Sequence, residues 1–185
     1  MKIPESDISK NKPGDKKKSL NNWIVSGLIM SFLISLAGSF FPYQSNIQTM
    51  LFKIDALFAI AAFACLGSKA TSENSDIAAA GFNVIAIAQG LFLAEVDNPG
   101  HWNYETATTA ALFMIPSFLM ISYYTKFPTW LRTAGIVMTV PFIILVILRN
   151  FVDLEKMSLV ESIVYLSYQL ITLCWAWQIW KENKI

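Results

Sequence analysis

Six apolar stretches, separated by shorter polar segments, follow one another along this 185-residue chain. Each approaches the roughly 20 residues that a helix needs to cross the hydrocarbon core of a bilayer. With 55% hydrophobic residues, a soluble domain of this length could not bury so many apolar stretches. The pattern therefore predicts an all-α, polytopic membrane protein, a bundle of six transmembrane helices in one domain over residues 23–180. The expected spans are residues 23–41, 48–67, 77–96, 106–124, 133–148 and 158–180.

Positive charges are unevenly divided between the segments that flank these stretches. Eleven of the 14 Lys and Arg residues lie in the two tails and in the loops 68–76 and 125–132. Because cytoplasmic segments of membrane proteins are enriched in Lys and Arg, this division predicts that both termini are cytoplasmic. We therefore expect an integral protein of the plasma (inner) membrane, with a disordered basic tail over residues 1–22 and a short tail over residues 181–185.

The sixth stretch carries a polar face. Glu161, Tyr165, Tyr168 and Thr172 recur at spacings of four, three and four, which brings them to one side of a helix, and Gln169 lies beside them. Such a face is costly against lipid, so it must meet protein, a partner or water. The other end of the stretch holds three tryptophans of the kind found at a membrane interface.

Polar residues also interrupt the second and third stretches. Lys53 and Asp55 lie in the first turns of the second, Asn83 and Gln89 lie within the third, and Glu95 ends it. Asp55 is too short to reach the interface as a lysine does, and it falls on the side of the helix that carries small alanines. This side chain is therefore expected to face protein or water.

Prolines are expected to distort two of the spans. Pro116 and Pro141 lie near the middle of the fourth and fifth stretches. A proline within a helix removes one backbone hydrogen bond and usually kinks the helix. Membrane helices accept this where neighbouring groups satisfy the freed carbonyl.

With both termini inside, the charged residues of the spans fall in the outer half of the bundle, where we expect an outward-facing cavity lined by carboxylates. Burial favours the protonated form of a carboxyl group, so one of these acids would carry a proton during transport. The alternative is structural: Asp55 pairs with Arg149 or Lys53, and Glu161 lies at the level of the headgroups. The expected solute- or ion-binding residues are Asp55, Glu161, Arg149, Glu95, Tyr165, Tyr168, Gln89 and Asn83.

These features favour a channel or transporter for a small polar or cationic solute, surrounded by the lipid bilayer. Seams of small residues further predict close helix packing or a homo-oligomer. A second interpretation is a non-catalytic membrane subunit or interaction protein of a larger complex, whose polar face meets a partner subunit. A third is a small lipid-modifying enzyme that uses the outer carboxylates as acid and base.

Signatures of other chemistry are missing from the sequence. A single histidine, His101, excludes bis-histidine haem ligation and multi-histidine zinc sites within this chain. There is no G-x-S-x-G, P-loop or G-x-G-x-x-G motif, and the basic tail lacks the aromatic residues typical of nucleic-acid binding. We therefore expect no catalytic residues, metal, cofactor or nucleic-acid partner, and we expect Cys65 and Cys174 to be packing residues.

Overall fold

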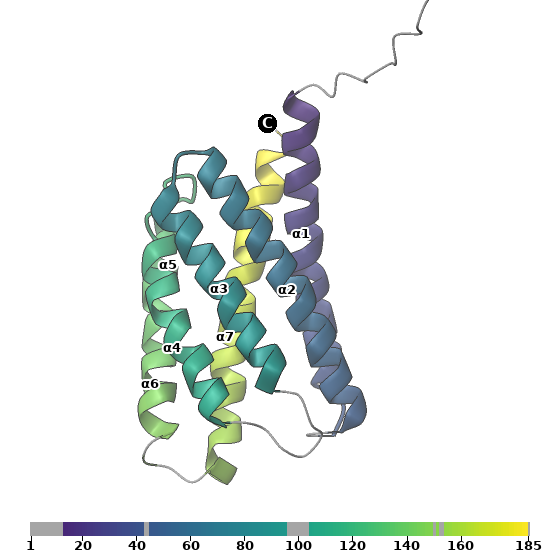
Figure 1. Ribbon diagram of the computed structural model, residues 1–185, viewed down its shortest axis with the longest axis vertical. Coiled ribbons are helices and arrows are strands. Elements are labelled where there is room, and N and C mark those ends of the chain that lie inside the picture. The colour runs from purple at the N-terminus through teal and green to yellow at the C-terminus, as the bar shows by residue number, and fades with distance from the viewer. Residues whose placement is uncertain (1–12, 43–44, 96–103, 150, 152–153, 185) are drawn as a thin grey trace, which may run out of the picture.

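A computed structural model describes residues 13–42, 45–95, 104–149, 151 and 154–184. Within these residues the chain forms seven helices and no strand, which confirms the predicted all-α class (Figure 1). The helices are α1 (Pro13–Gly38), α2 (Asn46–Ser72), α3 (Asp76–Glu95), α4 (Tyr104–Ile121), α5 (Thr129–Val137), α6 (Thr139–Arg149) and α7 (Leu154–Glu182).

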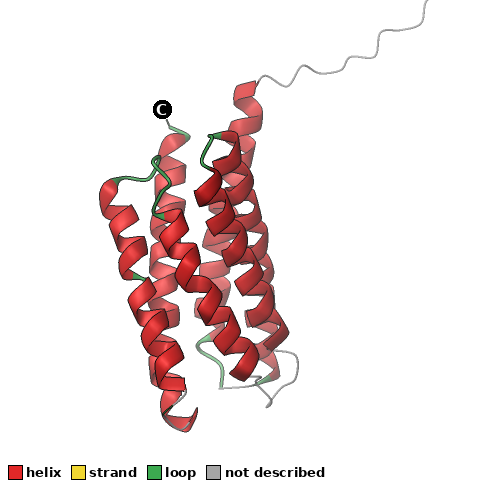
Figure 2. Ribbon diagram, turned by 60° about the vertical axis from the view of Figure 1, so that its left-hand side comes forward, coloured by secondary structure: helices red, strands yellow, loops and turns green. Residues whose placement is uncertain are grey.

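The helices run alternately up and down and close into a ring. α1, α2, α3 and α4 pack side by side in chain order, α5 and α6 continue one another beside α4, and α7 lies between α6 and α1 (Figures 1 and 2). α1 begins and α7 ends at the same end of the bundle, here called the terminal end. The opposite end, where α1 ends and α2 begins, is called the far end.

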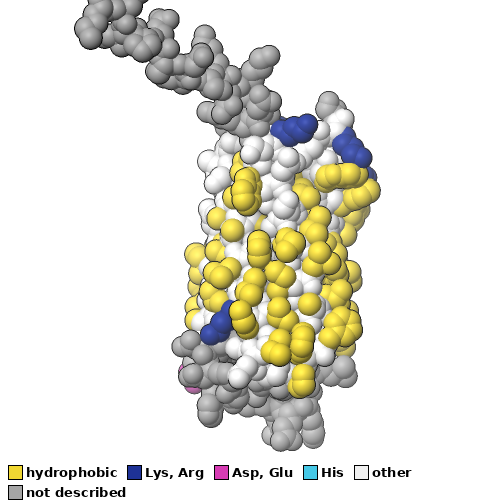
Figure 3. All heavy atoms as spheres, turned by 90° about the vertical axis from the view of Figure 1, so that its right-hand side faces the viewer, with side chains coloured by type: hydrophobic (Ala, Val, Ile, Leu, Met, Phe, Trp, Pro, Cys, Tyr) yellow, Lys and Arg dark blue, Asp and Glu magenta, His cyan; other side chains and the backbone are white. Residues whose placement is uncertain are grey.

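Four helical segments are long and apolar enough to cross a membrane. They are Lys17–Gly38, Asn46–Ser72, Asp76–Ala94 and Thr129–Arg149. The apolar part of α4, Glu105–Ile121, is shorter, and α7 is not in this group because its polar face lowers its hydropathy. Hydrophobic side chains cover the middle of the bundle, with Lys and Arg toward its two ends (Figure 3). A surface of this kind suits lipid rather than water.

Two helices extend further than the apolar stretches predict. α1 begins at Pro13, ten residues before the expected start at Trp23, because proline suits the first position of a helix, where no backbone donor is needed. α2 continues through Ser72, into the segment expected to be a loop. The helix ends there with Glu73 as its C-cap; Asn74 follows in a left-handed conformation with a φ of 57°, and the Ser75 amide donates to the Ala70 carbonyl. The rest of the predicted tail, residues 1–12, lies outside the described residues.

The two prolines act differently. The fifth span divides into α5 and α6 at Met138, three residues before Pro141. Pro141 has no amide hydrogen to give the Val137 carbonyl, and its ring crowds that carbonyl, so the helix is interrupted there. α4 instead continues through Pro116.

The interior of the ring is filled by aromatic side chains in its terminal half. Trp175 of α7 is fully buried, and its ring centroid lies 5.7 Å from that of Phe82 and 5.8 Å from that of Phe118. Phe63 and Phe127 complete this aromatic cluster at 6.2 and 6.1 Å from Trp175. Offset and edge-to-face pairs of this kind favour a well-defined packing.

Candidate functional site

Asp55 is the most deeply buried carboxylate among the expected site residues. It lies nine residues into α2, about 14 Å from the start of the helix at 1.5 Å per residue, and its exposure is 3%. The Ser31 hydroxyl of α1 donates a hydrogen bond to one carboxylate oxygen, and the Tyr165 hydroxyl of α7 donates to the other. Among the described residues, only these two neutral hydroxyls bond to Asp55.

Tyr165 connects Asp55 to two further polar groups. Its hydroxyl accepts hydrogen bonds from the Ser35 hydroxyl at 3.1 Å and from the Gln169 side-chain nitrogen at 2.9 Å. The amide oxygen of Gln169 is buried and has no donor within the described part of the chain. We call Asp55, Ser31, Ser35, Tyr165 and Gln169 the carboxylate cluster; it joins α1, α2 and α7 in the far half of the ring.

Tyr168 and Gln89 form a second polar contact beside the carboxylate cluster. The Gln89 side-chain nitrogen of α3 donates to the Tyr168 hydroxyl at 3.0 Å, and both residues are buried. The Tyr168 ring lies 6.2 Å from the ring of Tyr165 and 6.4 Å from that of Phe63 in the aromatic cluster. The polar face of α7 thus points into the ring and ends where the aromatic cluster begins.

Arg149 and Glu161 form a separate group. An Arg149 terminal nitrogen lies 2.8 Å from the Glu161 carboxylate, and its Nε lies 3.2 Å from the same oxygen. Arg149 also donates to the Thr108 hydroxyl of α4 at 3.2 Å. The guanidinium therefore ties α4, α6 and α7 together. Arg149 pairs with Glu161 and not with Asp55, so the alternative pairing of Asp55 with Arg149 is not seen.

The two remaining residues of the expected site lie elsewhere or outside the described side chains. Asn83 is exposed, and it packs against α2 at Gly67, where an added Cβ would approach the Asn83 amide oxygen to 2.4 Å. Glu95 closes α3, and its side chain is outside the described residues. The eight predicted residues thus fall into separate places. Asp55 and Tyr165 belong to the carboxylate cluster, Gln89 contacts Tyr168, Arg149 pairs with Glu161, and Asn83 and Glu95 belong to none of these groups.

A buried charge cluster at the terminal end escaped the sequence analysis, which placed Lys69 in a loop. Lys69 is 1% exposed, and its ammonium lies 2.9 Å from both the Glu73 and the Glu182 carboxylates. The Tyr124 hydroxyl donates to the other oxygen of Glu73. These four residues, here called the lysine cluster, join α2, the loop after α4 and α7. The Lys69 and Glu73 spacing of four was the available signal, since it places both side chains on one helix face.

Ionisation in the lysine cluster follows from these contacts. Burial opposes the charged form of Glu73, but hydrogen bonds from Tyr124 and Lys69 and the charges of Lys69 and Lys17 outweigh it. The pKa of Glu73 therefore lies below its ordinary value. Burial, together with the hydrogen bond to Glu73, raises the pKa of Tyr124. Glu73 is therefore a carboxylate at neutral pH, and Tyr124 stays protonated as its donor.

Two observations on the described side chains bear on metal and redox chemistry. Within the described ranges, no three His, Cys, Asp or Glu residues gather where they could hold a metal ion. Cys65 and Cys174 are free thiols, both partly buried. No protein family, curated protein or solved structure matches this chain.

Proposed function

We propose that this chain is a channel or transporter for a proton or a small polar or cationic solute, with Asp55 as its ion-binding group. The observation that carries the proposal is a carboxylate buried inside a membrane-type bundle and held only by neutral hydroxyls within the described chain. A buried carboxylate without a cation is costly, so the site favours binding a proton or a cation.

The groups around Asp55 support a cation better than an anion. The carboxylate oxygens and the unpartnered Gln169 amide oxygen are all acceptors, and the hydroxyls of Ser31, Ser35 and Tyr165 can turn their oxygens toward a cation. Oxygen ligands from carboxylate, amide and hydroxyl groups suit hard cations. The substrate class inferred from this set is a proton, an alkali cation or a small solute that carries hydrogen-bond donors.

We infer that the site is reached from the far end. The aromatic cluster fills the ring between Asp55 and the terminal end, and the lysine cluster closes the terminal end itself. Transport would require both to move, because a packed aromatic interior leaves no path for a hydrated ion. The arrangement corresponds to a resting state that is closed on the terminal side.

The proposal includes six membrane crossings, with both termini on the cytoplasmic side of the plasma (inner) membrane. Its support is the up-and-down order of the helices, the excess of Lys and Arg in the segments at the terminal end, and the exposed apolar side chains between the two ends. α7 belongs among the crossings because Tyr168, Gln169 and Thr172 of its polar face are buried inside the ring and not exposed to lipid.

The rival interpretations receive less support. A partner subunit would need the polar face of α7 at the surface, but Tyr168, Gln169 and Thr172 are 2–3% exposed. A lipid-modifying enzyme would need paired acid and base groups, but Glu161 is already bonded to Arg149. A homo-oligomer remains compatible with transport by each copy.

The test is ion flux through the purified full-length protein in liposomes. A pH-sensitive dye inside the vesicles reports proton flux, with imposed Na⁺ or K⁺ gradients testing the two cations. Asp55→Asn keeps the shape of the side chain but removes the charge, and we expect it to lower flux at least about tenfold, because mutating the groups that support an ion site costs about 10–100-fold in affinity or activity. The matched control is Asp76→Asn, an exposed carboxylate at the start of α3. Equal flux through wild type and Asp55→Asn would overturn the proposal.

A further inference from the structure

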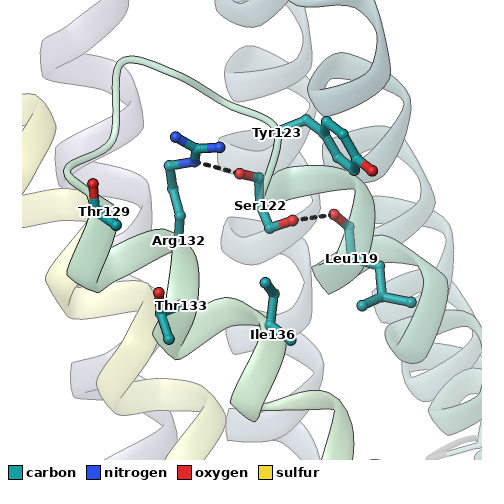
Figure 4. A pocket seen from close by; sticks show the side chains of 7 residues that line it. All are labelled: Leu119, Ser122, Tyr123, Thr129, Arg132, Thr133 and Ile136. Atoms are coloured by element: carbon teal, nitrogen blue, oxygen red, sulfur yellow. Dashed lines mark hydrogen bonds between the residues drawn. The ribbon is translucent and has the colours of Figure 1, made fainter.

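A pocket of about 450 Å³ lies between the end of α4 and the side of α5, near the terminal end (Figure 4). It lies outside both the carboxylate cluster and the lysine cluster. Its upper boundary is the loop that leads from α4 to α5, and its lower part is apolar. The lining residues are Leu119, Ser122, Tyr123, Thr129, Arg132, Thr133 and Ile136.

Among the described residues, Arg132 is the only charged one that lines this pocket. Its Nε donates to the Ser122 backbone carbonyl at 2.5 Å, which holds the side chain upright from α5 (Figure 4). In the described part of the chain its two terminal nitrogens donate no hydrogen bond. A half-buried guanidinium that is fixed at Nε and free at its terminal nitrogens presents the planar fork that binds phosphate oxygens.

The start of α5 adds further donors to the same place. Thr129 and Thr133 lie one turn apart on the pocket side of α5, and their hydroxyls make no side-chain hydrogen bond within the described residues. Pro128 precedes the helix and gives its first turn no side-chain cap. Open amides and the helix dipole at such an N-terminus favour a negative charge. Arginine, hydroxyls and helix N-terminus together predict an anion with several oxygens.

The lower part of the pocket distinguishes a lipid from a free phosphate. Leu119 and Ile136 are 44% and 46% exposed and continue into the apolar surface of α4 and α5. Tyr123 and Trp130, 62% and 57% exposed, lie at the level of the loop, where aromatic rings mark a membrane interface. A free phosphate has no apolar group to contact the lower part of the pocket. A phospholipid can place its headgroup in the polar part and its acyl chains against the apolar part.

We propose that this pocket binds an anionic phospholipid, with Arg132 on the phosphate and the acyl chains along Leu119 and Ile136. Basic pockets between membrane helices on the cytoplasmic side bind such headgroups. The inference rests on the membrane placement under Proposed function and not on transport, so loss of lipid binding and loss of flux are separate results. A lipid bridging α4 and α5 stabilises the connection between them.

Binding is measured by native mass spectrometry of the full-length protein in detergent, titrated with phosphatidylglycerol or with phosphatidylcholine. We expect phosphatidylglycerol to bind about tenfold more tightly than phosphatidylcholine. Arg132→Gln should lower the affinity for phosphatidylglycerol about tenfold, because a charge-assisted hydrogen bond to the phosphate is lost. Lys126→Gln, an exposed cation in the same loop, is the matched control and should change affinity less than about threefold.

A second variant separates binding from folding. Thr133→Leu leaves Arg132 and its bond to Ser122 in place but fills the pocket, and it should also weaken phosphatidylglycerol binding. The proposal would be overturned if Arg132→Gln bound phosphatidylglycerol as tightly as wild type. It would also be overturned if Lys126→Gln weakened phosphatidylglycerol binding as much as Arg132→Gln does. If millimolar inorganic phosphate displaced phosphatidylglycerol as strongly as added lipid does, the site would be one for free phosphate and the lipid proposal would be overturned.

Discussion

Replacing Lys69 by methionine tests whether the lysine cluster holds the terminal end together. Methionine keeps most of the length and apolar volume of lysine but removes the ammonium. Glu73 and Glu182, with side-chain exposures of 11% and 22%, would then lose the cation that lies 2.9 Å from each of them. Two mostly buried carboxylates, one directly after α2 and one in α7, would remain without that charge between them, although Glu73 would keep the exposed Lys17 at 3.4 Å.

The expected cost follows from the burial of these groups. Removing one partner of a buried ion pair destabilises a protein by about 3–5 kcal/mol, because the remaining charge stays buried without compensation. Water reaches part of both carboxylates, which places the Lys69→Met cost near the lower end, about 3 kcal/mol. For a chain of this size that corresponds to a melting temperature lower by roughly 6–12 °C.

The assay is thermal unfolding of the purified protein in detergent, followed by tryptophan fluorescence. Lys126→Met is the control, since Lys126 is exposed in a loop at the same end, and it should leave the melting temperature nearly unchanged. Adding Glu73→Gln and Glu182→Gln to Lys69→Met removes all three charges and should recover part of the loss. A Lys69→Met cost below about 1 kcal/mol, or no recovery in the triple variant, would refute this reasoning.

Two further predictions concern helix packing and pH. Gly81→Ala would place a Cβ 2.9 Å from the Ser117 carbonyl oxygen, so we expect it to destabilise the α3–α4 contact by about 1–3 kcal/mol. A Cβ at Gly90 would meet no atom within 4 Å, so Gly90→Ala should be neutral or slightly stabilising in the same thermal assay. The pKa of Glu73 in the folded state lies below its ordinary value of 4.5, so the stability that Glu73 contributes is present above pH 4.5 and is lost as the pH falls through the folded pKa. Melting temperatures measured from neutral to acidic pH should therefore fall less steeply in Glu73→Gln than in wild type. Parallel curves for the two proteins would contradict this.

The hydrophobic pattern alone determined the helical class, because period and length depend only on the order of residues. Local spacing also showed that Tyr165, Tyr168 and Thr172 share a face of α7, and that this face must avoid lipid. The position of Pro141 near the middle of the fifth span predicted a distortion, which the structure places at Met138. Each of these features is local, so each could be derived without knowing which helices are neighbours.

Only the tertiary structure decided which polar residues meet. Sequence spacing cannot tell that α7 lies between α1 and α6, and this order brings Tyr165 to Asp55 and Glu161 to Arg149. Asn83 was expected to line the cavity together with Gln89, but the rotation of α3 places it at the surface beside Gly67 of α2. Lys69 appeared to be a loop residue because its segment is polar, yet the Glu182 carboxylate of α7, together with the nearby Glu73, allows it to be buried. Contacts between distant segments depend on helix order and rotation, which packing of the whole ring sets.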